Sequence, residues 1–121
     1  MAANKVIGDE AELVAERWLQ AQGLKPLERQ YRCRFGEIDL VMKDGTTLVL
    51  VEVKYRSHQL ADAVASVGFA KQKKLSQAAR LLFTERPQWQ NLDWRFDVLA
   101  MTGNPQAPEI NWFKAAFELA G

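Results

Sequence analysis

Hydrophobic and polar positions along the first half of the chain predict one helix followed by three strands. Apolar residues recur at helical spacing after Asn4, which can cap the helix, and Gly23 is placed to end it. Three strand patterns follow, over residues 27–33, 37–43 and 46–54. Asp44-Gly45 lies between the last two and is a strong hairpin-turn signal. The first half therefore indicates a helix followed by a small antiparallel sheet.

The second half returns to a helical pattern and then to a strand. The helix runs from about Ser66 to Pro87, and residues 92–101 alternate as a fourth strand. Residues 110–113 could form a short edge strand, and residues 114–119 a final helical turn or two. The helical crossover is long enough to make the fourth strand parallel to the third. We therefore expect an α/β fold with an α-β-β-β-α-β order, in which helices flank a mixed central sheet, as a single domain over residues 1–121.

Acidic residues interrupt the two strands of the hairpin where apolar residues are expected. Val49, Val51 and Val53 share one face of the third strand, and its other face is apolar until Glu52 and Lys54. A two-residue Asp44-Gly45 loop would pair Lys43 with Thr46, Asp39 with Leu50, and Glu37 with Glu52. The side chains of Glu37, Asp39, Glu52 and Lys54 would then converge on one face. A loop longer by two residues would set Asp39 opposite Glu52 and keep this facing, whereas an odd loop would break it.

Ionised side chains inside a sheet cost several kcal/mol unless something compensates them. A Mg²⁺ ion held by Asp39 and Glu52 is one compensation, and Glu12 in the first helix could supply a third carboxylate. Lys54 could then orient an attacking water or stabilise developing charge in phosphodiester hydrolysis. Glu37 would either contact the metal ligands from behind without binding the ion itself, or be an exposed residue at the start of its strand. The alternative reading is a buried network in which the acids and Lys54 merely neutralise one another.

Composition and charge narrow the function classes. The chain has 121 residues, of which 48% are hydrophobic and 26% charged, as in an ordinary globular protein. One cysteine and one histidine exclude an internal disulfide and a Cys/His zinc cluster. Neither a secretory signal nor an apolar run of about 20 residues is visible, so we expect a soluble cytoplasmic protein. Between Val53 and Thr84 six lysines and arginines face a single acid, which suits a polyanion partner or a solvated helix face.

Three further groups of residues have both a functional and a structural reading. Arginines 29, 32 and 34 around Tyr31 could contact phosphates beside a stacking ring, or be ordinary surface arginines. Arg95 and Asp97 share a face of the fourth strand and are expected to form a structural pair. The aromatic residues of the C-terminal third are expected to be core or helix cover, with a dimer contact as the alternative.

The D…ExK pattern of Asp39, Glu52 and Lys54 resembles the PD-(D/E)xK nuclease superfamily and its restriction-endonuclease-like α-β-β-β-α-β core. More narrowly, the chain resembles the YraN family of uncharacterised, endonuclease-like bacterial proteins, related to archaeal Holliday junction resolvases. The resemblance covers nearly the whole chain and includes GDEAELVAERWLQAQG, RCRFGEIDLV, LVLVEVKYRS, AKQKKLSQAARLL and RFDVLAM. One departure is Ile38, which precedes Asp39 where the superfamily name has proline.

The resemblance implies that Glu12, Asp39 and Glu52 are associated with metal, that Lys54 is catalytic, and that Lys71 and Gln72 lie near the substrate or the active site. The combined reading is an endonuclease that uses Mg²⁺, or Mn²⁺ in its place, on DNA that is branched or otherwise structured. Phosphate contacts are expected from Arg32, Arg34, Arg56, Lys71, Lys73 and Lys74. The resemblance to resolvases also allows a homodimer. The alternatives are a catalytically silent nucleic-acid-binding module and a protein-interaction domain.

Overall fold

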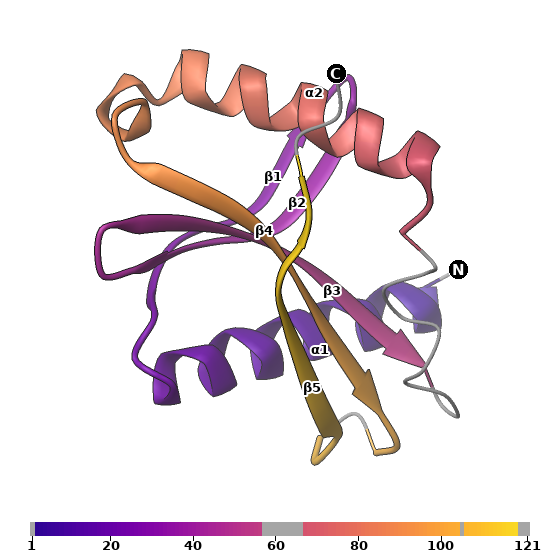
Figure 1. Ribbon diagram of the computed structural model, residues 1–121. Helices are drawn as coiled ribbons and strands as arrows, with labels where there is room; N and C mark the ends of the chain where they lie inside the picture. The colour runs from indigo at the N-terminus through magenta and orange to yellow at the C-terminus, as the bar shows by residue number, and fades with distance from the viewer. Residues whose placement is uncertain (1, 57–66, 105, 119–121) are drawn as a thin grey trace.

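The computed structural model describes residues 2–56, 67–104 and 106–118. Its elements are α1 (Ala2–Ala21), β1 (Lys25–Cys33), β2 (Gly36–Asp44), β3 (Thr47–Arg56), α2 (Phe69–Glu85), the 3₁₀ turn η1 (Pro87–Trp89), β4 (Asp93–Thr102) and β5 (Glu109–Phe117). The strands form one mixed sheet in the order β1-β2-β3-β4-β5, in which β3 and β4 are parallel and the other neighbours antiparallel (Figure 1). The predicted α/β fold and its parallel crossover are confirmed.

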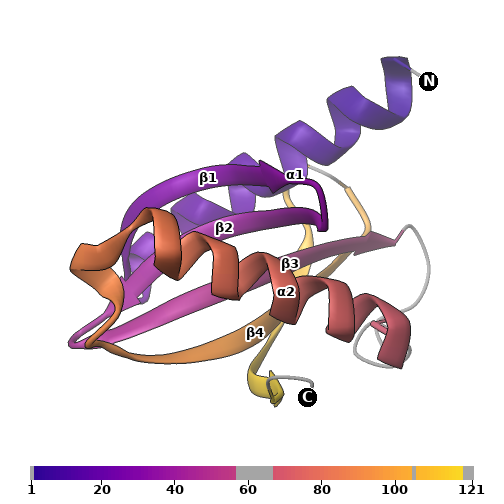
Figure 2. The same cartoon turned by 90° about the horizontal axis from the view of Figure 1, so that it is seen from above.

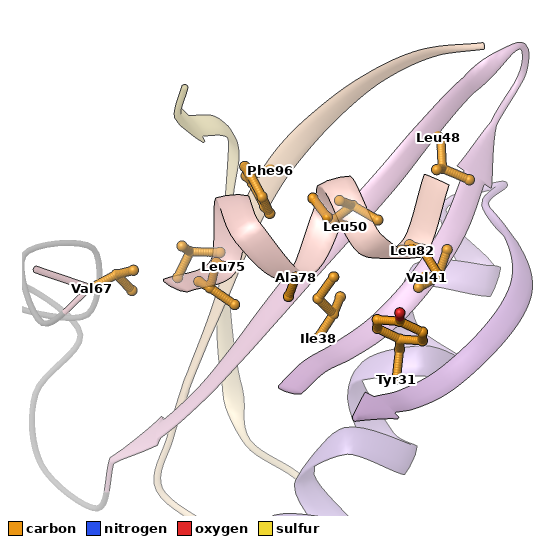
Figure 3. Packing of buried hydrophobic residues seen from close by; sticks show 12 residues of the cluster. Tyr31, Ile38, Val41, Leu48, Leu50, Val67, Leu75, Ala78, Leu82 and Phe96 are labelled. Carbon is orange, nitrogen blue, oxygen red and sulfur yellow. The ribbon is translucent and has the colours of Figure 1, made fainter. Parts of the chain in front are cut away.

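The two helices lie on opposite faces of the sheet (Figure 1, Figure 2). Helix α1 packs on one apolar cluster, whose strand members are Leu40, Met42, Val49, Val51, Leu99 and Met101. Helix α2 packs on the other, with Tyr31, Ile38, Val41, Leu48, Leu50, Phe96 and Val98 (Figure 3). Strand β3 contributes to both clusters, which explains why both of its faces are apolar in the sequence.

The helix ends agree partly with the sequence. Helix α1 begins at Ala2, so the predicted start at Asn4 is wrong, because the alanines before it are strong helix formers. It ends as predicted at Gly23, where φ is +100° and the Leu24 N–H donates to the Leu19 carbonyl at 3.1 Å. Helix α2 begins at Phe69, and the predicted start at Ser66 lies outside the described residues. Within the described ranges, no helix has the length and apolarity needed to cross a membrane.

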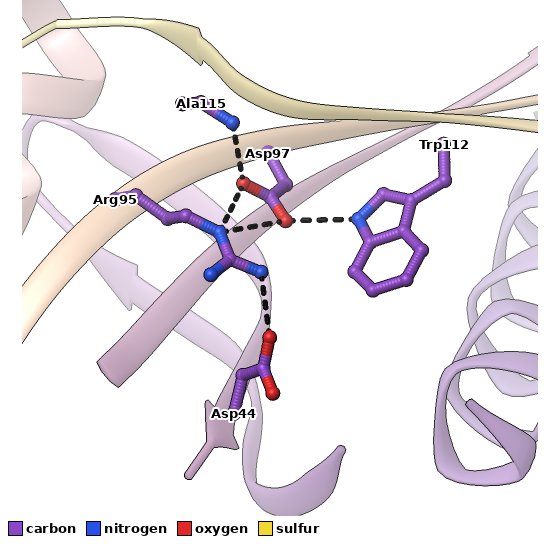
Figure 4. A network of polar contacts seen from close by, with 5 residues as sticks. All are labelled: Asp44, Arg95, Asp97, Trp112 and Ala115. Carbon is purple, nitrogen blue, oxygen red and sulfur yellow. Dashed lines mark hydrogen bonds and ion pairs between the residues drawn. The ribbon is translucent and has the colours of Figure 1, made fainter. Parts of the chain in front are cut away.

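Strand β5 is longer than the sequence predicts. The helical turn expected over residues 114–119 is wrong for its described part, because the strand continues to Phe117. Its ladder with β4 shifts beside Asp97, where Ala115 has a φ of +49°. The Asp97 carboxylate, which is fully buried, accepts the Ala115 N–H at 2.9 Å, Trp112 Nε1 at 2.8 Å and Arg95 Nε at 3.0 Å (Figure 4). The predicted Arg95–Asp97 pair is therefore confirmed, and it holds the irregular part of β5 in place.

The β2–β3 hairpin has a different register from the predicted one. Asp44 pairs with Thr47 and Val41 with Leu50, so the expected pairs Lys43–Thr46, Asp39–Leu50 and Glu37–Glu52 are wrong. The loop is Gly45-Thr46, and Gly45, with φ of +63°, takes the first loop position, where type II′ turns place glycine. The observed pairs have the register of the longer-loop alternative, but the pairing ends at Leu40 with Val51, so Asp39 and Glu52 lie just beyond the ladder.

Candidate acidic and metal-binding site

Three carboxylates meet where α1 passes the beginning of β2. Glu12 comes from α1, and Glu37 and Asp39 come from β2. One oxygen of each lies within 4.8 Å of an oxygen of the other two, and these three residues are called the acidic cluster here. Strict alternation along β2 is broken at this point, because Ile38 and Val41 pack on the α2 side while Leu40 packs on the α1 side. The fold thus brings together Glu12 and Asp39, which are 27 positions apart in the sequence.

Asp39 is held in place by the backbone of the neighbouring strand. Its side chain is 9% exposed, and Oδ2 accepts the Val53 N–H at 2.8 Å. The backbone ladder between β2 and β3 extends only to Leu40 and Val51. The Asp39 carboxylate therefore satisfies a β3 donor beyond that ladder, and this hydrogen bond fixes the orientation of the carboxylate.

Gln30, which no pattern in the sequence singles out, positions Glu12. Gln30 Nε2 donates to Glu12 Oε1 and to Asp9 Oδ1, both at 3.0 Å. Its backbone has a φ of +54°, an unusual conformation for a residue other than glycine, asparagine or aspartate. No local sequence signal marks this conformation, since neither Gln30 nor its neighbours Arg29 and Tyr31 favour a positive φ. The strained backbone turns the amide toward α1.

Glu37 carries the least satisfied oxygen of the acidic cluster. Its Oε1 is buried and accepts no hydrogen bond among the described residues. Arg32 Nε lies 3.5 Å from this oxygen, at ion-pair distance but without hydrogen-bond geometry. A buried carboxylate oxygen without a donor is unfavourable in a metal-free protein. The same oxygen is available as a ligand for a cation.

The acidic cluster holds protons more tightly than ordinary carboxyl groups. Burial, followed by the negative charge of Glu52, raises the pKa of Asp39 to about 8, although the Val53 N–H acts to lower it. Burial and the charge of Glu37 raise the pKa of Glu12 to about 7, against the hydrogen bond from Gln30. Both carboxyl groups are therefore largely or partly protonated at neutral pH unless positive charge is supplied.

Glu52 lies beside the acidic cluster but contacts lysines instead. Its side chain is 6% exposed, and Oε1 lies 2.5 Å from Lys71 Nζ and 3.4 Å from Lys54 Nζ. Burial lowers the pKa of Lys54, and the Lys71 ammonium acts in the same direction. Burial also acts to lower the pKa of Lys71, but its hydrogen bond to Glu52 raises the pKa overall. Glu52, Lys54 and Lys71 are called the ion-pair cluster here.

The donor set of the acidic cluster suits a hard divalent cation. All three side chains offer carboxylate oxygens, the ligands that Mg²⁺ and Mn²⁺ prefer, and one of them lacks a hydrogen-bond donor. Of the three residues expected to hold metal, the structure brings Glu12 and Asp39 together. Glu37 takes the third place, and Glu52 is near enough for its charge to act on both.

Comparison with known proteins assigns the chain to a family. The model of the uncharacterised protein family UPF0102 matches residues 11–101. A UPF0102 protein of Pseudomonas syringae pv. syringae is 48% identical, with 92% of each chain covered. A UPF0102 protein YraN of Salmonella agona is 49% identical over 94% of this chain and 86% of its own. This chain belongs to the family UPF0102. The expected YraN relationship is thereby confirmed.

The remaining site residues predicted for this UPF0102 chain differ in their exposure and in their contacts. Arg32, Arg34, Lys73 and Lys74 are exposed. The Arg34 guanidinium lies over the Phe35 ring, 4.7 Å from its centroid. Gln72 donates to the Val67 carbonyl at 2.8 Å and so supports the start of α2. The side chain of Arg56 lies outside the part of the chain that the structure describes.

Proposed function

We propose that this UPF0102 chain is a Mg²⁺-dependent nuclease that hydrolyses phosphodiester bonds in DNA, with branched or otherwise structured DNA as its substrate. The observation that supports this most directly is the placement of three converging carboxylates beside the buried Glu52–Lys54 pair. Ordinary surface acids repel one another and are solvated, whereas Asp39 and Glu52 are both buried. A cation would compensate the negative charge that appears when Asp39 and Glu12 lose their protons.

In this proposal the acidic cluster holds the ion through Glu12, Asp39 and Glu37, and Glu52 completes the site from β3. A divalent ion at such a site polarises a water and neutralises charge on the scissile phosphate. The chain's own contribution is to fix the carboxylates, through the Val53 N–H for Asp39 and through the Gln30 amide for Glu12. These contacts reduce the rearrangement that binding requires.

Lys54 is suited to act on the attacking water. Its side chain is 12% exposed and extends from β3 two residues after Glu52, whose Oε1 it contacts. Because burial lowers the pKa of Lys54, its ammonium gives up a proton more readily than a surface lysine does. The amine can therefore hold or release a proton next to the carboxylates. A buried ammonium there also stabilises negative charge as the phosphate is attacked.

A basic surface on α2, the helix that supplies Lys71 to the ion-pair cluster, supports a polyanionic substrate. The sequence of α2 from Phe69 to Thr84 contains four lysines and arginines and no acid. Lys73 and Lys74 are exposed on it, and Phe69 at its start is 75% exposed. Ammonium groups bind phosphates, and an exposed ring can stack on an unpaired base. Such a combination suits DNA with an unpaired segment.

The second candidate is a nucleic-acid-binding module without catalysis. The specific observation in its favour is that two lysines already neutralise Glu52, as in a structural ion network. In that case the acids and lysines would stabilise the fold, and the basic surface alone would bind DNA. The two candidates differ in whether any bond is broken.

A cleavage assay with Mg²⁺ on single-stranded, duplex, flap and four-way DNA separates them. We expect the unmodified chain to cut at least one of these substrates, and Asp39→Asn and Lys54→Ala to lower the rate by at least about 100-fold. Asp93→Asn, which changes an exposed acid at the start of β4, is the matched control and should cut normally. Salt-dependent binding without cleavage would favour the silent module. Equal cleavage by Lys54→Ala would remove this lysine from the mechanism.

A further inference from the structure

Two lysine amino groups contact one oxygen of Glu52, although a single ammonium would balance the carboxylate. Lys71 Nζ lies 2.5 Å and Lys54 Nζ 3.4 Å from Oε1. Lys54 belongs to the same strand as Glu52, whereas Lys71 reaches it from the first turn of α2. Figure 2 shows the start of α2 on the side of the molecule where β3 ends. Lys71 therefore joins the helix to the strand end that carries the site.

The two lysines differ in how easily they can leave Glu52. The Lys54 side chain is 12% exposed, so its ammonium has little water to move into. The Lys71 side chain is 41% exposed and can turn outward by rotation of its flexible stem. Solvation of a displaced ammonium compensates much of the lost ion pair at an exposed position. Lys71 is thus the exchangeable partner and Lys54 the fixed one.

The acidic cluster, unlike Glu52, has little basic pairing among the described residues. Glu12, Glu37 and Asp39 converge within 4.8 Å, and the only basic side chain that the described residues pair with them is that of Arg32, on Glu37. Glu52 is near enough that its charge acts on both Asp39 and Glu12. Lys71 therefore neutralises Glu52, a carboxylate whose charge also acts on the acidic cluster.

We propose that Lys71 is a displaceable stand-in for the metal: it occupies Glu52 in the metal-free protein and leaves when a divalent cation binds. The inference rests on the metal site proposed above. An ion that recruits Glu52 must compete with the Lys71 ammonium, so the apparent affinity for metal is lowered by the fraction of molecules in which Glu52 is occupied. The ammonium of the displaced Lys71 then adds to the basic surface of α2.

The displacement would couple metal binding to substrate binding. Lys71 released from Glu52 can bind a phosphate group, together with Lys73 and Lys74 on the same helix. By linkage, a phosphate that holds Lys71 away from Glu52 strengthens metal binding by the same factor. Metal and DNA would therefore bind with positive cooperativity, and removal of Lys71 would reduce that cooperativity.

Calorimetric titration of the full chain with Mn²⁺, in the absence of DNA, tests the competition. We expect Lys71→Gln to bind Mn²⁺ roughly tenfold more tightly than the unmodified chain, because its Glu52 has lost the exchangeable competitor and keeps only the contact with Lys54. Lys73→Gln removes the same charge from an exposed position on the same helix and measures the general electrostatic effect. Its gain in affinity should be several-fold smaller.

A second pair of variants tests whether the effect passes through Glu52. In a Glu52→Gln background, adding Lys71→Gln should change Mn²⁺ affinity no more than adding Lys73→Gln does. An equal gain for Lys71→Gln and Lys73→Gln in the unmodified background would overturn the displacement while leaving the metal site intact. Absence of Mn²⁺ binding in the unmodified chain and in Lys71→Gln alike would overturn both the inference and the proposed function.

Discussion

Asp39 shows how a single carboxyl group links the fold to the proposed chemistry. It is almost fully buried, its orientation is fixed by the Val53 N–H, and its pKa is raised to about 8. The unfolded chain has an ordinary aspartate, with a pKa of about 3.9. Between these two values the folded protein holds a proton that the unfolded chain has released. The free energy of unfolding of the metal-free protein therefore falls as the pH rises from about 4 to about 8.

Replacement of Asp39 by asparagine should remove much of this pH dependence. The asparagine side chain would keep an oxygen to accept the Val53 N–H but would carry no charge at any pH. We expect metal-free Asp39→Asn to differ little from the unmodified chain near pH 4 and to be more stable by several kcal/mol near pH 8.5. Thermal unfolding followed by circular dichroism, in the presence of a chelator, measures the difference. Asp93→Asn serves as the exposed control, and a stability gain that is the same at both pH values would contradict the raised pKa.

The candidate site was predictable at the residue scale only where the strand pattern itself was broken. Asp39 and Glu52 stand out in the sequence because acids interrupt apolar strands. Gln30 does not stand out, since its role depends on a backbone φ of +54° that no neighbouring residue signals. The position of Glu37 beside Glu12 depends in turn on the broken alternation along β2, which places the start of that strand against α1.

At the scale of elements, the order of helices and strands was predictable from local sequence patterns. The strand register and the end of β5 depend on contacts between distant residues and were not predictable. The order of helices and strands follows from apolar periodicity and from Gly23 and Pro87. The hairpin register was missed because a glycine with positive φ can take either loop position, and each choice shifts the pairing by two residues. The end of β5 was missed because Ala115 and its neighbours favour helix locally, while the buried Asp97 binds the strand from β4.

The Asp97 network should therefore carry much of the attachment of β5. Asp97→Ala removes the acceptor of Trp112 Nε1 and of the Ala115 N–H. Among the residues that the structure describes, it leaves the partly buried Arg95 with Asp44 as its one acidic partner. We expect a loss of about 3–5 kcal/mol in the free energy of unfolding, as for a broken buried pair. Denaturant unfolding measures it, and hydrogen exchange should show faster exchange of the Ala115 amide.

Asp93→Ala is the matched control for this network, because Asp93 lies in the same strand but is exposed. Its cost should stay within about 0.5 kcal/mol. A similar loss for the two variants would show that Asp97 stabilises β4 alone and not the irregular part of β5.

At the scale of the whole molecule, a net charge of +1 conceals two regions of opposite sign. The acidic cluster lies between α1 and β2, and the lysines of α2 cover the opposite face of the sheet near the end of β3. Glu52, with Lys54 and Lys71, forms the border between them. The proposed nuclease would use both regions, the acidic cluster to hold a cation and the lysines to hold the substrate's phosphates.

This arrangement predicts that metal binding displaces protons as well as Lys71. At pH 7 the carboxyl groups of Asp39 and Glu12, with pKa values of about 8 and about 7, hold protons that an ion must expel. Binding of Mn²⁺ should therefore release roughly one proton or slightly more at pH 7 and almost none near pH 9.5, and its affinity should rise with pH between them. Calorimetric titration in two buffers of different protonation enthalpy measures the number of protons released.

Asp39→Asn should bind Mn²⁺ more weakly and release about one proton fewer. Binding at pH 7 without proton release would show that the ion is held by other groups.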